Sequence, residues 1–123
     1  MDLFHTLTAT LSNAKPTGTA DGIDLKPLLQ NPETKLNRDA LYFHYPHYYA
    51  TTTPVSAVRS GDWKLLEYLE DGRSELYHLQ DDPGEQTDLA HRRPDKAASL
   101  LQQLQEWRTE GNAAMPTPNP NSR

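Results

Sequence analysis

The stretch of sequence that decides the fold is Asp62-Trp-Lys-Leu-Leu-Glu-Tyr-Leu-Glu-Asp-Gly-Arg-Ser-Glu-Leu-Tyr-His-Leu79. Within it, two runs rich in aromatic and branched apolar residues lie on either side of Asp71-Gly72. An Asp-Gly pair between such runs is typical of a tight turn that joins two antiparallel strands. Two similar runs lie upstream, and the first contains Pro46, which the interior of a helix would not tolerate. The sequence therefore predicts an antiparallel sheet of four strands, near residues 39–47, 54–60, 62–69 and 74–79.

Downstream of the sheet, apolar residues recur at intervals of three and four residues, which is the spacing of an amphipathic helix. Pro94 suits the first helical turn and Gly111 the C-terminal end, so we predict a long helix near residues 95–110. Its apolar stripe, expected to be buried on the sheet, contains Leu100, Leu101, Leu104 and Trp107. The same spacing predicts a short helix over residues 2–12. The expected fold class is α+β: a four-stranded antiparallel sheet with a long C-terminal helix packed on one face, plus a short N-terminal helix and extended loops.

The composition excludes several classes of function. A chain of 123 residues has room for one small domain, and its 35% of hydrophobic residues predicts a thin core. The net charge of −5 argues against a surface for nucleic acid or anionic membrane, and no apolar run approaches the roughly 18–20 residues of a membrane span. The absence of cysteine excludes disulfides, thiolate zinc sites and a cysteine nucleophile. We therefore expect neither nucleic acid nor membrane as a partner.

Both faces of the predicted sheet carry apolar side chains. Because side chains of a strand alternate between faces, Trp63 and Leu65 share one face, while Leu66 and Tyr68 share the other. The long helix can cover one face, which leaves the other to the short N-terminal helix, a loop or a second domain. We therefore expect an apolar patch opposite residues 95–110 that is larger than the few hundred Å² typical of a monomer, and a partner that covers it.

The densest cluster of chemistry-bearing residues is Tyr42-Phe-His-Tyr-Pro-His-Tyr-Tyr49, with five of the ten aromatic residues and two of the five histidines. Aromatic planes with polar tips suit the binding of a sugar or aryl ring, although a buried core strand would use the same residues. His44 and His47 do not predict a metal site, because residues three apart in a strand face opposite ways and no third ligand lies nearby. The acidic segment 81–85 lacks the ligand spacing of a calcium loop and predicts a type II turn centred on Pro83-Gly84.

Six segments follow one another along the chain in a recognisable order: Asp2-Leu-Phe4, Asp21-Gly-Ile-Asp-Leu-Lys-Pro-Leu-Leu29, Ala40-Leu-Tyr-Phe-His-Tyr-Pro-His-Tyr48, Val58-Arg-Ser-Gly-Asp-Trp-Lys-Leu-Leu66, Glu75-Leu-Tyr-His-Leu-Gln-Asp-Asp-Pro-Gly-Glu85 and Met115-Pro-Thr-Pro-Asn-Pro120. The most specific elements in them are Gly-Asp-Trp-Lys-Leu and Leu-Tyr-x-Leu-x-x-Asp-Pro-Gly-Glu. Together these segments resemble the C-terminal subdomain of a type I sulfatase, the arylsulfatase-like, formylglycine-dependent family, and the resemblance covers nearly the whole chain.

The resemblance implies that the chemistry of the complete enzyme lies elsewhere. In that family a large N-terminal domain carries the formylglycine, made from a Cys/Ser-x-Pro/Ala-x-Arg motif, and the ligands of a calcium ion. These 123 residues contain no such motif, so we expect no catalytic residue, no metal ligand and no cofactor in this chain. Residues 1–30 are then the helix and loop at the junction with the catalytic domain, and residues 31–123 are the C-terminal subdomain. The expected function is to help close the substrate pocket, with no activity alone.

The resemblance also implies partners and a substrate-contacting set. The expected partners are the N-terminal catalytic domain, in the same or a separate chain, and a sulfated carbohydrate or aryl sulfate. His44, His47 and Tyr45 are the expected substrate-binding residues. The family is commonly periplasmic, secreted or lysosomal. The alternative hypothesis is a free-standing module that binds carbohydrate or protein on a sulfatase-like scaffold.

Overall fold

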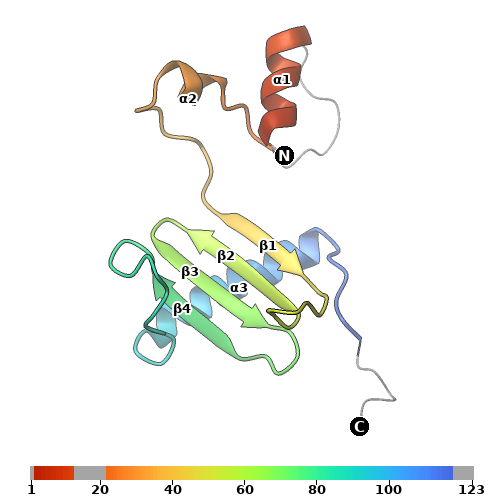
Figure 1. The fold of residues 1–123 in the computed structure, drawn as a ribbon, viewed down its shortest axis with the longest axis vertical. Helices are drawn as coiled ribbons and strands as arrows, with labels where there is room; N and C mark the ends of the chain where they lie inside the picture. The colour runs from red at the N-terminus through yellow and green to blue at the C-terminus, as the bar shows by residue number, and fades with distance from the viewer. Residues whose placement is uncertain (1, 13–21, 118–123) are drawn as a thin grey trace. The chain divides into compact units, whose positions relative to one another are not determined.

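The computed structural model describes residues 2–12 and 22–117, and the chain divides into two units, Met1–Arg38 and Asp39–Arg123. The first unit contains helix α1 (Asp2–Ser12), as predicted, and the short helix α2 (Lys26–Gln30), which was not predicted from the sequence (Figure 1). No helix in the described residues is long and apolar enough to cross a membrane.

The first unit is held together by the side chain of Asp2. Its carboxylate accepts hydrogen bonds from the Ile23 N–H at 3.1 Å and from the two terminal guanidinium nitrogens of Arg38 at 2.5 and 2.9 Å. The hydroxyl of Thr6, which is buried, accepts from the Leu25 N–H at 2.9 Å. These bonds fix the segment before α2 beside the first turns of α1.

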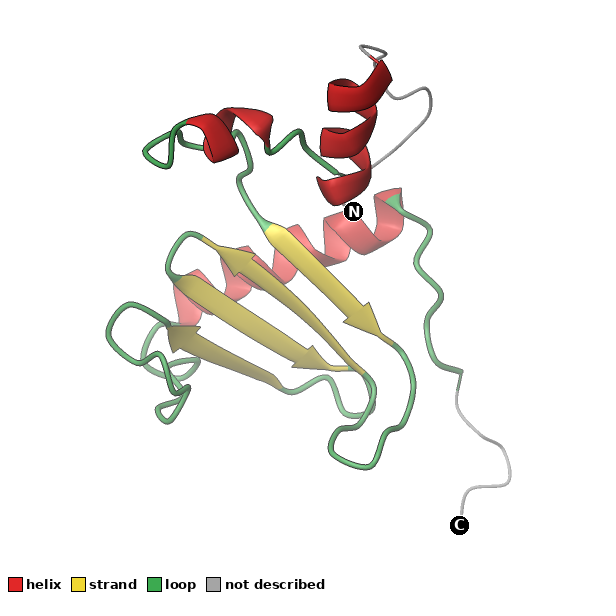
Figure 2. Cartoon of the chain, turned by 45° about the horizontal axis from the view of Figure 1, so that its top comes forward, coloured by secondary structure: helices red, strands yellow, loops and turns green. Residues whose placement is uncertain are grey.

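The second unit is a four-stranded antiparallel sheet with one helix on one face, which confirms the predicted fold class. Its strands are β1 (Leu41–Tyr45), β2 (Val55–Ser60), β3 (Trp63–Tyr68) and β4 (Ser74–His78), and they pair in the order β1-β2-β3-β4. Helix α3 (Pro94–Glu110) lies across the back of this sheet in the view of Figure 1, and Figure 2 shows the same layering from another side.

The core lies between α3 and the sheet. It consists of Val58, Leu65, Leu76, Ala97, Leu100 and Leu104. Leu100 and Leu104 are buried as predicted, whereas Leu101 and Trp107 are only half-buried at the border of the core. The ring of Trp107 stacks on that of Tyr42 with centroids 4.8 Å apart and planes 4° from parallel. Trp107 thus extends the core toward the edge strand β1.

Two glycines make the connections of the meander possible. Gly61 lies between β2 and β3 with φ of 59°, and Gly72 lies between β3 and β4 with φ of 73°. Residues with a Cβ rarely adopt this left-handed backbone region, because the Cβ crowds the following carbonyl oxygen. The predicted tight turns are therefore present, although the second loop spans residues 69–73.

The predicted type II turn at Pro83-Gly84 is wrong in its type. The turn exists, since the Glu85 N–H donates to the Asp82 carbonyl at 3.2 Å, but the left-handed residue is Glu85, with φ of 53°. The Asp82 carboxylate accepts hydrogen bonds from the N–H groups of Gln86 and Thr87, each at 2.8 Å. The left-handed residue lies at position 85, one residue later than a type II turn would place it.

Candidate functional site

The face of the sheet opposite α3 is partly uncovered. Along β1, the exposed fractions of Leu41, Phe43 and Tyr45 are 37%, 59% and 43%. We call these three residues the β1 row. They point to the same side because they alternate with Tyr42 and His44, which face α3. Apolar side chains on this face are therefore exposed at the edge strand, while the predicted size of the patch stays a prediction.

A hollow of about 220 Å³ continues from the β1 row across the neighbouring strands. At its polar end, the ammonium group of Lys64 contacts both carboxylate oxygens of Glu85 at 2.6 and 2.7 Å. Arg59, paired with Lys64 across β2 and β3, stays exposed. The lining residues are Phe43, Ala57, Val58, Arg59, Lys64, Leu79 and Glu85.

A cluster of hydrogen-bonded side chains covers the part of this face over β3 and β4. The Glu75 carboxylate accepts hydrogen bonds from the hydroxyls of Tyr68 and Tyr77, each at 3.0 Å, and from Arg73 at 2.6 Å. The guanidinium of Arg73 also lies 3.5 Å from the centre of the Tyr68 ring. Burial, and then the hydrogen bond to Glu75, raises the pKa of both tyrosine hydroxyls. These groups satisfy one another over β3 and β4, whereas the β1 row stays exposed.

An aromatic loop follows β1. The rings of Tyr45 and His47 meet edge to face with centroids 5.6 Å apart, and His47 is exposed. A pair of backbone hydrogen bonds between Tyr49 and Thr52, at 3.0 and 3.3 Å, closes the loop. The Tyr48 hydroxyl donates to Glu70 at 3.1 Å, and this bond raises its pKa. The loop therefore presents polar and aromatic groups beside the β1 row.

The structure separates the three residues expected to bind substrate. Tyr45 and His47 lie together at the end of β1, whereas His44 points to the α3 side. There, its Nδ1 is 2.7 Å from the Ser56 hydroxyl and its Nε2 is 2.7 Å from the Ala114 carbonyl oxygen. Both ring nitrogens of His44 are thus engaged within the chain, while Tyr45 and His47 are open to a ligand.

Sequence reasoning missed a buried polar cluster next to His44. Arg108 contacts Glu67 at 2.6 Å and donates to the Ser56 hydroxyl at 3.1 Å, and the exposed fractions of these three residues are 8%, 9% and 1%. The positions of these residues in the sequence already pointed to the cluster. Arg108 continues the apolar stripe of α3, and Ser56 and Glu67 occupy strand positions that alternate to the core face.

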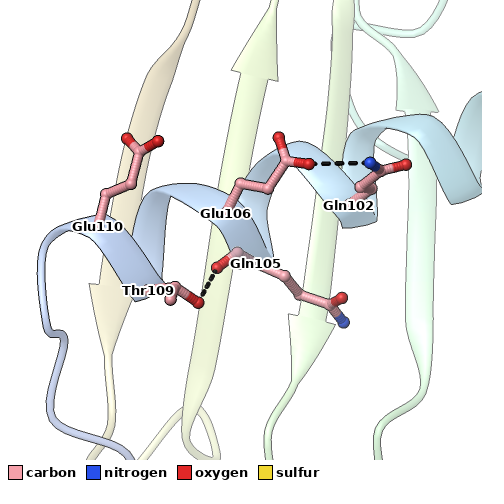
Figure 3. Close-up of a pocket in the computed structure, with 5 residues that line it drawn as sticks. All are labelled: Gln102, Gln105, Glu106, Thr109 and Glu110. Carbon is pink, nitrogen blue, oxygen red and sulfur yellow. Dashed lines mark hydrogen bonds between the residues drawn. The ribbon is translucent and has the colours of Figure 1, made fainter.

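The outer face of α3 carries a second hollow, drawn in Figure 3. Its side chains come from successive turns of one helix and bond to one another, as Gln102 does to Glu106 at 2.8 Å. The Thr109 hydroxyl donates to the carbonyl of Gln105 at 2.8 Å. This is a solvated helix surface that brings no second element to a ligand.

Comparisons of the sequence with known proteins find a sulfatase family and a sulfatase relative. The family of N-sulphoglucosamine sulphohydrolase C-terminal domains matches residues 1–110. A Δ4,5-hexuronate-2-O-sulfatase of Bacteroides thetaiotaomicron is 35% identical over 91 residues, which are 73% of this chain and 19% of that enzyme.

Solved structures share the fold of this chain. A 2-O GAG sulfatase superposes with a TM-score of 0.76 at 28% identity, over 91% of this chain and 25% of that one. A second structure, in complex with its substrate D-glucosamine-2-N,6-O-disulfate, superposes with a TM-score of 0.73 at 24% identity, over 94% of this chain and 24% of that one. The chain thus spans about a fifth to a quarter of the length of these proteins.

Proposed function

The chain belongs to the family of N-sulphoglucosamine sulphohydrolase C-terminal domains, and on that premise we propose that it acts as the C-terminal subdomain of a sulfatase. In this proposal, hydrolysis of the sulfuric ester takes place in a separate catalytic domain, in the same or another chain. The 123 residues help to close the substrate pocket and are inactive alone.

The residues present do not fit the cofactors of the complete enzyme. Membership of the family implies a formylglycine and a calcium ion there. The sequence contains no cysteine and no Ser-x-Pro/Ala-x-Arg segment from which a formylglycine could form. Among the described residues, no group of three or more His, Asp or Glu side chains could hold a metal ion. Both groups therefore belong to the catalytic domain in this proposal.

The exposed β1 row is the observation that carries the proposal. One face of the sheet is covered by α3, while the edge strand presents Leu41, Phe43 and Tyr45 on the other. Burial of apolar area against a second domain contributes on the order of 25 cal/mol per Å². Arg59, exposed beside the hollow, offers a charge for a carboxylate of that domain. We assign this face to the contact with the catalytic domain.

Tyr45 and His47 are the residues we assign to the substrate. Tyr45 is the last residue of the β1 row and His47 follows it, so their rings meet edge to face at the border of the proposed domain contact. A sugar ring could stack there and accept or donate hydrogen bonds. The relatives are a hexuronate-2-O-sulfatase, a 2-O GAG sulfatase and an enzyme that takes a disulfated glucosamine. We therefore propose a sulfated, glycosaminoglycan-type sugar as the substrate class. His44, bonded at both nitrogens, is not assigned to it.

The experiment that tests this proposal is hydrolysis of 4-nitrophenyl sulfate by the purified chain, with and without calcium. We expect no turnover above the buffer blank, because the chain supplies no nucleophile. Turnover above the blank would contradict the proposal. Tight binding of sulfated oligosaccharides by the isolated chain, abolished by Tyr45→Ala and His47→Ala, would instead favour the free-standing module.

A further inference from the structure

A chain of polar contacts runs through the buried side of the sheet. It begins at Glu67 on β3, passes through Arg108 on α3 and Ser56 on β2, and reaches His44 on β1. It ends at the carbonyl oxygen of Ala114, beyond the helix. The four distances, in this order, are 2.6, 3.1, 2.7 and 2.7 Å. Three strands, the helix and the C-terminal segment are therefore joined by one row of side chains.

The groups at the two ends determine which atom donates and which accepts in each hydrogen bond of this row. A guanidinium only donates, so the Ser56 oxygen accepts from Arg108 and its own hydrogen is free for His44 Nδ1. A backbone carbonyl only accepts, so His44 Nε2 must carry a hydrogen to bond Ala114. The arrangement in which each group has its complement is a neutral imidazole with its hydrogen on Nε2.

The backbone after α3 turns back toward this histidine. Asn112 adopts the left-handed region with φ of 47°, and the Ala113 N–H donates to the Arg108 carbonyl at 2.9 Å. Asn tolerates this conformation better than most residues, and such a residue after a helix reverses the chain. This reversal places the carbonyl oxygen of Ala114 within hydrogen-bonding distance of His44 Nε2.

We propose that His44 is a positioning residue that anchors the C-terminal segment 113–117 to β1 in its Nε2-H tautomer, which Ser56, Arg108 and Glu67 select. The anchor holds His44 on the α3 side of β1, and alternation along the strand then directs Tyr45 to the opposite face. This inference goes beyond the proposed function and does not depend on a catalytic domain or a substrate.

The tautomer is tested by long-range ¹H–¹⁵N spectra of the histidine side chains in the full chain at neutral pH. We expect the His44 ring to show a bonded hydrogen on Nε2 and an unprotonated Nδ1. Ser56→Ala should shift the Nδ1 resonance of His44 and leave the resonances of His47 unchanged. A hydrogen on Nδ1, an average of two tautomers, or a His44 spectrum indifferent to Ser56→Ala would overturn the proposal.

The anchoring is tested by backbone ¹⁵N heteronuclear NOE values, which report motion on the picosecond to nanosecond timescale. In the wild-type chain we expect Met115 and Thr117 to be as ordered as Leu104 in α3. His44→Phe, which keeps an aromatic ring but no nitrogen, should lower the values at 115 and 117 only. The control His47→Phe should lower neither. If His44→Phe fails to fold, mobile values at Met115 and Thr117 in the wild type still overturn the proposal, and ordered values there together with the expected Ser56→Ala shift support it.

Discussion

His44 and Tyr45 are neighbours in the sequence and lie on opposite faces of the sheet. From composition alone, the two residues and His47 form one aromatic-histidine cluster with one expected role. The alternation of β1 divides that cluster, because His44 meets the buried polar row while Tyr45 meets His47 outside. The sequence groups these residues in one stretch of chain, but only the pairing partner Ser56 and the segment at Ala114 decide which side chain is engaged within the chain.

The buried pair of Glu67 and Arg108 gives a stability prediction. Glu67→Leu should lower the free energy of unfolding by about 3 kcal/mol, because it leaves the guanidinium of Arg108 buried without its counter-charge. The double variant Glu67→Leu, Arg108→Met should recover most of this loss, since an apolar pair of similar volume needs no desolvation of charge. Urea unfolding measures both. A double variant as unstable as the single one would contradict this account of the pair.

Asp2 gives a prediction of pH dependence. Hydrogen bonds from Arg38 and then Ile23 lower its pKa to about 2, against an ordinary value near 3.9. Because the folded pKa is the lower one, the contribution of the ionised carboxylate is complete above about pH 4 and is lost as the pH falls toward 2. The Ile23 amide resonance should titrate with a midpoint near pH 2 and not at all in Asp2→Asn. A midpoint near 4 would show that Asp2 is not bonded in this way.

Among the connections between elements, the left-handed glycine between β2 and β3 gives a stability prediction. Gly61→Ala should lower the free energy of unfolding by about 1 kcal/mol or slightly more, because alanine pays a steric cost in the left-handed region. The loss is conformational, since nothing lies within 4 Å of the added Cβ. Gly84→Ala, at a glycine outside that region, is the matched control and should change stability little. Equal effects of the two substitutions in thermal or urea unfolding would refute the prediction.

The strands and long helix could be predicted because each carries its own local signal. The alternation of β3, the stripe of α3 and the glycine turns agree with one another, so the element bounds differ from those expected by at most two residues at either end. Helix α2 was missed because five residues are too short for a period to emerge. The turn at Pro83-Gly84 was assigned the wrong type because a side chain, Asp82, overrides the preference of the dipeptide.

At the scale of the whole molecule, exposed apolar side chains set the behaviour of the isolated chain. The β1 row and the leucines of α1, with Leu11 81% exposed, leave apolar surface in water. We expect the purified chain to bind an environment-sensitive apolar dye and to associate with rising concentration in sedimentation experiments. Phe43→Lys should reduce both effects, whereas Gln102→Lys on the outer face of α3 should reduce neither. A monomer that binds no dye would show that the chain completes its own core.

A chimera tests whether the open sheet face joins a catalytic domain. The region of the 35% identical Bacteroides sulfatase that corresponds to this chain is replaced by residues 1–123, and sulfate release from its hexuronate-2-O-sulfated substrate is measured. We predict an active chimera in which Phe43→Lys lowers activity at least about tenfold, because an unpaired buried charge costs more than ~1.4 kcal/mol. The charge-matched control Gln102→Lys should retain full activity. Equal activity of the two variants would contradict the claim.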